Sequence, residues 1–294
     1  MKHVQFAVRR GVLIRAVMIC FCIVTASAWA DRARAAVLYS NDTPNTSMAA
    51  ASRPANGNFA EIEAADDFLF TTTSRIDGAT FTGLLPAGAP LANITGVAVE
   101  IYRVFPLDST NPPDNAVPTR NNSPSDVAFV GRDSAVAGEL TFTSAILNPN
   151  FTAANSVLNG INKSTTPATG GEGPVSGEEV RFTLTFPGGI TLPANHYFFK
   201  PEVGLSNGNF FWLSATRPYA GVGAANPDLQ AWIRNTNLDP DWLRIGADIV
   251  GGEIPPTFNL AFSLTGVPEP KTVWLAAVGA AGLLLAVRRK RRLA

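Results

Sequence analysis

Cysteine is almost absent from this chain, and Cys20 and Cys22 both lie in the apolar stretch near the N-terminus. If that stretch is removed on export, the remaining chain has no thiol, which excludes disulfides, thiolate catalysis and cysteine metal sites. Histidine is nearly as scarce, because only His196 lies outside the N-terminal stretch. A zinc site built from several histidines is therefore excluded, and a Ser-His-Asp triad would have to use this one residue.

Acidic residues are missing from both ends of the chain. The 23 basic and 23 acidic residues cancel overall, but ten of the basic ones lie in residues 1–30 and 271–294. The body between them, residues 31–270, carries 13 basic against 23 acidic residues, a formal net charge of −10. We therefore expect no nucleic acid partner, and no binding to anionic lipid through bulk charge.

The N-terminus has the three parts of a secretory signal. Basic residues come first, an apolar run over residues 16–24 follows, and Ala28 and Ala30 form an A-x-A cleavage site. We predict a signal peptide over residues 1–30 that is cleaved before Asp31. A cut near residues 35–36 is the alternative.

The C-terminus combines three features in order. Val267, Pro268, Glu269 and Pro270 come first, and their prolines block helix formation. Residues 272–287 carry no charge and predict a single short transmembrane helix of roughly 24 Å. The chain then closes on five basic residues, which favour a cytoplasmic end: Arg288, Arg289, Lys290, Arg291 and Arg292. A plain membrane anchor is the alternative interpretation.

This combination resembles the PEP-CTERM protein-sorting tail of Gram-negative bacteria, over residues 267–294 or about a tenth of the chain. The resemblance implies recognition by a membrane-embedded exosortase, cleavage near the motif, and export linked to extracellular polysaccharide and biofilm. The expected partners are therefore exosortase, exopolysaccharide and, before processing, the inner membrane. The expected final location is the cell surface or the extracellular matrix.

Short runs of alternating apolar and polar residues predict an all-β domain over residues 31–266. Val180, Phe182, Leu184 and Phe186 alternate with polar residues, which is typical of a strand with one buried face. Strands are expected at 37–40, 67–72, 79–84, 96–105, 140–145, 179–186, 196–203, 210–215, 229–234, 244–249 and 258–264. This number of strands favours a β-sandwich, with jelly-roll winding. Two long loops are expected, over residues 106–126 and 148–177.

Three of the five tryptophans, Trp212, Trp232 and Trp242, lie within the segment 210–244, and the first two fall in expected strands. If exposed, their flat faces offer a stacking platform for sugar rings. If buried, they fill the sandwich core, which is the usual place of such side chains. The sequence favours the core and leaves the carbohydrate platform as the alternative.

Acidic residues gather at two places that are weak candidates for calcium. Asp66 and Asp67, preceded by Glu61 and Glu63, form the first group. The second group consists of Asp239, Asp241 and Asp248. Neither has the spacing of an EF-hand loop, and solvated turn carboxylates explain both. We expect no cofactor, with calcium as the alternative.

No motif in the body identifies a reaction. A pair of carboxylates for glycoside cleavage is inevitable among so many acidic residues, so their number decides nothing. The sequence therefore predicts no catalytic residues and a non-enzymatic surface or matrix protein with a structural or adhesive role. A secreted carbohydrate-active enzyme, or a carbohydrate-binding module, on a jelly roll is the alternative.

Overall fold

In a computed structural model, the structure describes residues 36–268, apart from 58, 114, 164–167 and 217–227. Contacts between residues divide the chain into two compact units, residues 1–36 and 37–294. All but one of the described residues lie in the second unit. The predicted signal cleavage site, membrane helix and basic end lie outside the described residues. Within the described ranges, no helix is long and apolar enough to cross a membrane.

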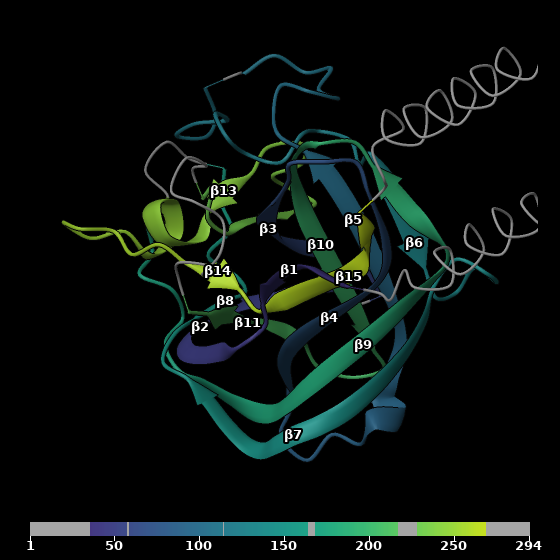
Figure 1. The fold of residues 1–294 in the computed structure, drawn as a ribbon. Helices are drawn as coiled ribbons and strands as arrows, with labels where there is room; N and C mark the ends of the chain where they lie inside the picture. Colours follow the sequence, from purple (N-terminus) through teal and green to yellow (C-terminus); the bar gives the residue numbers. More distant parts are fainter. Residues whose placement is uncertain (1–35, 58, 114, 164–167, 217–227, 269–294) are drawn as a thin grey trace, which may run out of the picture. The chain divides into compact units, whose positions relative to one another are not determined.

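The described chain forms two β-sheets (Figure 1). The nine-stranded sheet contains β1 Ala36–Asn41, β2 Pro44–Ala51, β4 Ser74–Pro86, β7 Thr141–Ala153, β8 Ser156–Val157, β9 Val175–Leu192, β11 Phe211–Ala215, β14 Asn259–Leu260 and β15 Phe262–Pro268. The six-stranded sheet contains β3 Ile62–Phe70, β5 Ile94–Arg103, β6 Val130–Asp133, β10 Asn195–Leu205, β12 Trp232–Asn235 and β13 Leu243–Arg244. A 3₁₀ turn, Leu91–Asn93, and a π-helical turn, Ile245–Val250, complete the described elements. The all-β sandwich prediction is confirmed, whereas its jelly-roll winding stays a prediction.

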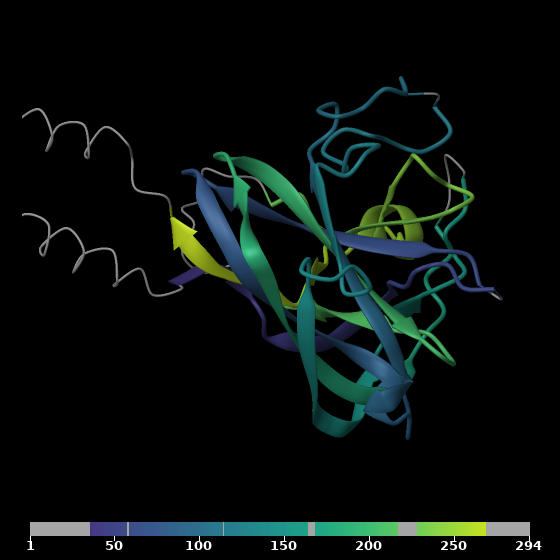
Figure 2. The same ribbon diagram turned by 90° about the vertical axis from the view of Figure 1, so that its right-hand side faces the viewer.

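The strand orders place segments from far apart in the chain beside each other. The larger sheet runs β1-β15-β4-β11-β2-β8, with β9 beside β4, β7 beside β9, and β14 beside β11. The smaller sheet runs β13-β12-β3-β10-β5-β6. Figure 2 shows the long strands β4, β7 and β9 from the side. In β9, Val180, Phe182 and Leu184 are buried while Thr183 and Thr185 are exposed, as the alternation predicts.

Aromatic rings from both sheets fill the space between them. Phe262 of β15 stacks on Phe199 of β10, with ring centroids 5.0 Å apart. Phe81 of β4 stacks on Phe182 of β9 at 4.8 Å. Trp212 of β11 contacts Phe81, Phe199 and Phe262 edge-on, and its indole N–H donates to the carbonyl of Ala261. This aromatic core joins the two sheets.

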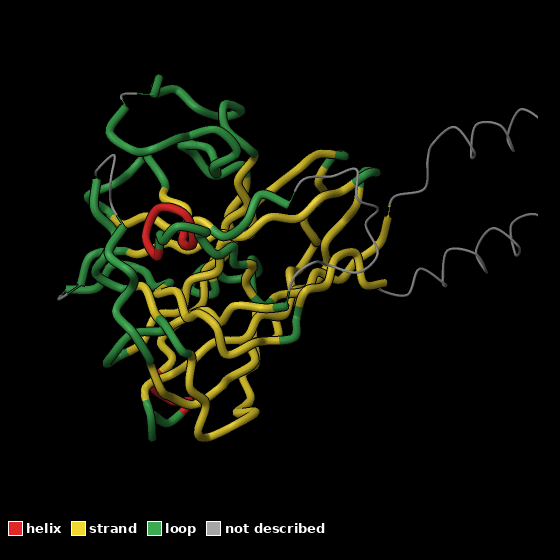
Figure 3. The backbone as a smooth tube through the Cα atoms, turned by 90° about the vertical axis from the view of Figure 1, so that its left-hand side faces the viewer, coloured by secondary structure: helices red, strands yellow, loops and turns green. Residues whose placement is uncertain are grey.

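Two details of the predicted fold are wrong. The segment 244–249 is not a strand, because after Arg244 the chain turns into the π-helical turn, which Figure 3 shows in red among the loops. The expected loop 148–177 is shorter, because β7 continues to Ala153 and β9 begins at Val175.

Three strands were not predicted, and one of them, the two-residue β8, lies within the expected loop 148–177. β2 ends in Met48 and three alanines that are all buried, so no alternation of apolar and polar residues marks it. Ala50 packs in the main core, while Ala49 packs with Leu84, Ala153 and Leu213 in a small cluster. A strand buried on both faces has no period-two pattern to recognise. β6 is only four residues long.

The aromatic core predicts a large cost for removing Trp212. Trp212→Ala is expected to lower the free energy of unfolding by about 3–5 kcal/mol, because it leaves a cavity and removes the hydrogen bond that the indole N–H donates. Thr143→Ala, at an exposed position of β7, is the control and is expected to change it by about 0.5 kcal/mol or less. Urea unfolding of the exported protein measures both, and equal effects would contradict the assignment of Trp212 to the core.

Candidate functional site

Charged side chains gather on the face of the six-stranded sheet that points away from the aromatic core. Strand alternation brings Glu63 of β3, Glu100 of β5, and Lys200 and Glu202 of β10 onto this face. The Lys200 Nζ lies 3.0 Å from an oxygen of Glu63, 3.0 Å from one of Glu100 and 3.1 Å from one of Glu202. Lys200 is only 1% exposed, so these carboxylates replace water around its ammonium group.

Arg234 of β12 completes this buried charge cluster. Its guanidinium forms a two-pronged ion pair with Glu63 and donates a 3.0 Å hydrogen bond to the hydroxyl of Tyr102. The guanidinium carbon lies 4.4 Å from the ring centroid of Trp242. Asp239 adds a more exposed ion pair at 2.8 Å. The positive charges are thus surrounded by carboxylates and aromatic rings, an arrangement that stabilises charge away from water.

Burial and pairing shift the pKa values of this cluster in opposite directions. Burial alone would raise the pKa of Glu63, but Lys200 and Arg234 outweigh burial and hold that pKa below its ordinary value. Burial raises the pKa of Glu202 to about 8, against the lowering effect of Lys200 and with the help of Glu61 and Glu63. The surroundings therefore favour the ionised form of Glu63, whereas burial of Glu202 favours its protonated form.

A second ion cluster attaches the loop 105–126 to the segment 239–242. Arg120 pairs with Asp126 inside the loop and lies 3.1 Å from an oxygen of Asp241. Its guanidinium also lies 4.3 Å from the ring centroid of Phe105. The indole N–H of Trp242 donates to the carbonyl of Ser125. The long loop is therefore fixed over the outer face of the six-stranded sheet rather than projecting freely.

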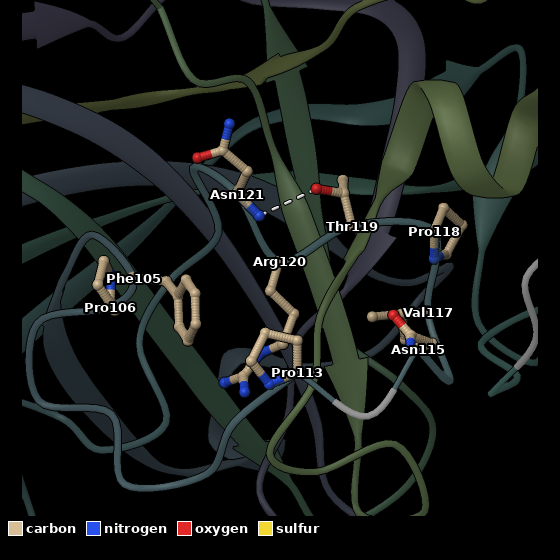
Figure 4. A pocket seen from close by; sticks show the side chains of 9 residues that line it. All are labelled: Phe105, Pro106, Pro113, Asn115, Val117, Pro118, Thr119, Arg120 and Asn121. Atoms are coloured by element: carbon tan, nitrogen blue, oxygen red, sulfur yellow. Dashed lines mark hydrogen bonds between the residues drawn. The ribbon is translucent and has the colours of Figure 1, made fainter.

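This loop also forms an open pocket of about 350 Å³. Figure 4 shows the ring of Phe105 beside the Arg120 side chain, and a hydrogen bond from the backbone N–H of Asn121 to Thr119. The pocket is lined by Phe105, Pro106, Pro113, Asn115, Val117, Pro118, Thr119, Arg120 and Asn121. None of these nine described residues carries a carboxylate.

The three tryptophans of the sugar-platform hypothesis are all buried. Trp212 and Trp242 are 0% exposed and Trp232 is 1% exposed. Trp212 belongs to the aromatic core, whereas Trp232 and Trp242 pack on the outer face of the six-stranded sheet with Tyr102 and Phe198. Because no flat face is open to solvent, these residues form no stacking platform for sugars in this fold. The structure favours the packing interpretation for all three.

The acidic residues considered for calcium do not converge. Asp66 accepts a hydrogen bond from the backbone N–H of Leu260, whereas the next residue, Asp67, pairs with His196 at 2.6 Å. Asp239 pairs with Arg234, and Asp241 with Arg120. In the described ranges, no three histidine, cysteine or acidic side chains form a group that could hold a metal ion. The expectation of no cofactor, with calcium as the alternative, stays a prediction.

The local sequence does not reveal the charge cluster around Lys200. Glu100 lies in an alternating run, between Val99 and Ile101, but β3 and β10 do not alternate, since like residues stand side by side in each. Alternation predicts that Glu100 faces away from the core, and this is correct. It does not predict that Tyr102, Arg234 and Trp242 pack around the cluster. The burial of the cluster follows from tertiary contacts alone.

The start of the predicted sorting motif is visible in the structure. Val267 and Pro268 end β15, opposite Arg75 and Ser74 of β4, while Glu269 and Pro270 lie outside the described residues. A family model described as the PEP-CTERM protein-sorting motif matches residues 266–292. The chain carries a PEP-CTERM sorting motif. No curated protein and no solved structure matches the chain.

The sorting motif confirms the resemblance seen in the sequence. It implies an exported protein that the C-terminus anchors in the membrane until an exosortase, the processing partner, cleaves it. The match covers only the end of the chain, so it assigns no activity to the sandwich.

Removal of Lys200 tests whether the charge cluster holds the fold together. Lys200→Met is expected to lower the free energy of unfolding by about 3–5 kcal/mol, because it leaves buried carboxylates without their cation. Lys163→Met is the control, since Lys163 is 40% exposed and lies 3.6 Å from Asp241; about 1 kcal/mol or less is expected. Chemical denaturation at pH 7 measures both, and a similar small loss for Lys200→Met would argue against a structural cluster.

Glu202 predicts a specific dependence of stability on pH. Its pKa is about 8 in the folded protein and near 4.5 when unfolded, so the folded state holds the proton more tightly. The stabilising contribution of Glu202 is fully present below pH 4.5 and is lost as the pH rises to about 8. Over this range the free energy of unfolding falls by at most about 1.4 kcal/mol per pH unit. Glu202→Gln should remove it, giving a flatter curve between pH 5 and 8.5 in urea titrations. Parallel curves for the two proteins would contradict the assignment.

Proposed function

We propose that the exported sandwich is a non-enzymatic protein of the cell surface or extracellular matrix, with a structural or adhesive role linked to exopolysaccharide. The sorting motif supports the export of the chain. The role of the sandwich itself rests on an observation about its surface. The outer face of the nine-stranded sheet presents rows of hydroxyl groups.

The rows follow from the strand register. Thr143 of β7, Thr183 of β9, Thr80 of β4 and Ser263 of β15 lie directly opposite one another on successive strands. The next row contains Thr141, Thr185 and Thr265, and on β4 the residue opposite Thr185 and Thr265 is Gly78. Directly opposite residues point to the same face, and here Phe182 and Leu184 occupy the other one. The exposed members are Thr141, Thr143, Thr183 and Thr185.

Hydroxyl rows suit a polysaccharide because each hydroxyl both donates and accepts hydrogen bonds, as sugar hydroxyls do. One such contact contributes only about 0.5–1.5 kcal/mol. A long polymer presents the same groups many times, so weak contacts add up through multivalency. A matrix polymer therefore fits this face better than a single small sugar.

The pairing of the charged groups supports a non-enzymatic role. Lys200 and Arg234 contact carboxylates, and His196 contacts Asp67, so these groups stabilise one another within the fold. An acid–base catalyst has to reach its substrate directly or through one water. Glu202, whose raised pKa suits a general acid, is only 4% exposed. The alternative, a carbohydrate-active enzyme or a carbohydrate-binding module, needs an open groove, with two facing carboxylates in the case of an enzyme.

Removal of the hydroxyl rows tests the adhesive role. The double variant Thr143→Val and Thr183→Val is expected to bind the polysaccharide of the producing bacterium about tenfold more weakly, since two hydrogen bonds are lost. Thr152→Val with Thr191→Val is the matched control, because these residues are also exposed on β7 and β9 but lie outside the rows. Co-sedimentation of the exported protein with purified matrix polysaccharide measures all three.

The outcomes separate the candidate functions. If the wild-type protein does not sediment with the polysaccharide, the adhesive role is wrong. If both double variants bind as the wild type does, the hydroxyl rows are not the contact surface. Release of new sugar ends from the polysaccharide during the assay would favour the enzyme.

A further inference from the structure

The sorting motif begins inside the folded sandwich rather than after it. The motif starts at residue 266, and β15 extends to Pro268. Gly266, Val267 and Pro268 lie opposite Ile76, Arg75 and Ser74 of β4. Figure 2 shows the arrowhead of β15, in yellow, at the end of the sheet. The first three residues of the motif therefore belong to the last strand, and no linker separates the two.

β15 is a structural strand whose loss the sandwich would not tolerate. Phe262 and Leu264 are both 0% exposed. Phe262 stacks on Phe199 of the opposite sheet, and on Tyr39 of β1 at 4.7 Å. Deleting a large buried side chain of this kind is among the most destabilising changes in a protein core. A released protein without β15 would lose this contact between the sheets.

The backbone of β15 has neighbours on both sides, β1 and β4. An enzyme that holds its substrate as an extended strand needs free backbone N–H and C=O groups along one edge. At Gly266 the packing is so close that a Cβ would lie 1.9 Å from the carbonyl oxygen of Arg75. Pairing with β4 up to Pro268, and the close packing at Gly266, therefore limit access to the peptide bonds of β15 while the sandwich is folded. Pro268, which has no N–H, ends the strand.

We propose that the folded sandwich sets the upstream limit of processing: the sorting enzyme cleaves C-terminal to Pro268, and β15 stays in the released protein. In hydrolysis, the C–N bond of one peptide group breaks, and one water supplies the hydroxyl of the new carboxyl end and a hydrogen of the new amine. This inference rests on the proposed processing by exosortase. It adds that the fold, besides the motif, determines which bond is cut.

The C-terminus of the released protein tests this limit. The full chain is produced in a host that has the sorting enzyme and in the same host without it, and the released protein is analysed by peptide mass spectrometry. Enzyme-dependent release with Pro268 or a later residue as the last residue supports the proposal. Enzyme-dependent release with most molecules ending at Val267 or earlier would overturn it while leaving the processing itself intact. Absence of enzyme-dependent release would overturn both.

A variant with weaker packing of β15 tests whether this packing limits where the chain is cleaved. Phe262→Ala is expected to produce additional ends upstream of Pro268, because β15 then separates from the core more often. Phe210→Ala is the matched control, since Phe210 is also 0% exposed but contacts Phe81 and Phe182 rather than β15. It is expected to keep the wild-type C-terminal residue.

The outcomes separate the possible causes. Upstream ends in both variants would show that overall stability, not the docking of β15, sets the limit. An unchanged end in Phe262→Ala would exclude a role for this docking. If Phe262→Ala does not accumulate, the wild-type end still decides the proposal.

Discussion

The stacking of Phe262 on Phe199 is the contact on which the rest of this structure depends. It joins β15 of the nine-stranded sheet to β10 of the six-stranded sheet. Trp212 and Tyr39 pack against the same ring, so four strands meet there. A body without cysteine has no disulfide to connect its two sheets. Burial of aromatic surface takes that role, because it is the main favourable term in folding.

β10 connects this core to the charge cluster on the other face of its sheet. Phe199 points into the core, while the next residue, Lys200, points outward into a group of carboxylates. Trp242 and the loop 105–126 cover that outer face, and Arg120 holds the loop through Asp126 and Asp241. Much of the six-stranded sheet is therefore covered on both faces, by different means. Its inner face is apolar, and its outer face is a network of paired charges, each of which requires its partners.

The nine-stranded sheet has a different outer face, and its last strand has a double role. Part of the outer face remains open to solvent and presents hydroxyl groups of β7 and β9. β15 contributes Phe262 to the core and also the first residues of the sorting motif. Folding and processing thus share one segment of the chain. The absence of a linker between them makes the end of the sheet a physical boundary for the enzyme.

The sequence by itself determined the targeting of this protein and its class of fold. The sorting motif is local, since prolines, an apolar run and basic residues act through their order in the chain, and the family model matched it. Alternation over β9 identified a half-exposed strand for the same local reason. Only the tertiary structure decided what covers the outer faces. Lys200 contacts Glu63 and Glu100, and Trp242 contacts Tyr102 and Ser125, which are all distant in sequence, and no local pattern records such contacts. The position of the motif within a core strand was likewise decided by the pairing of β15 with β4.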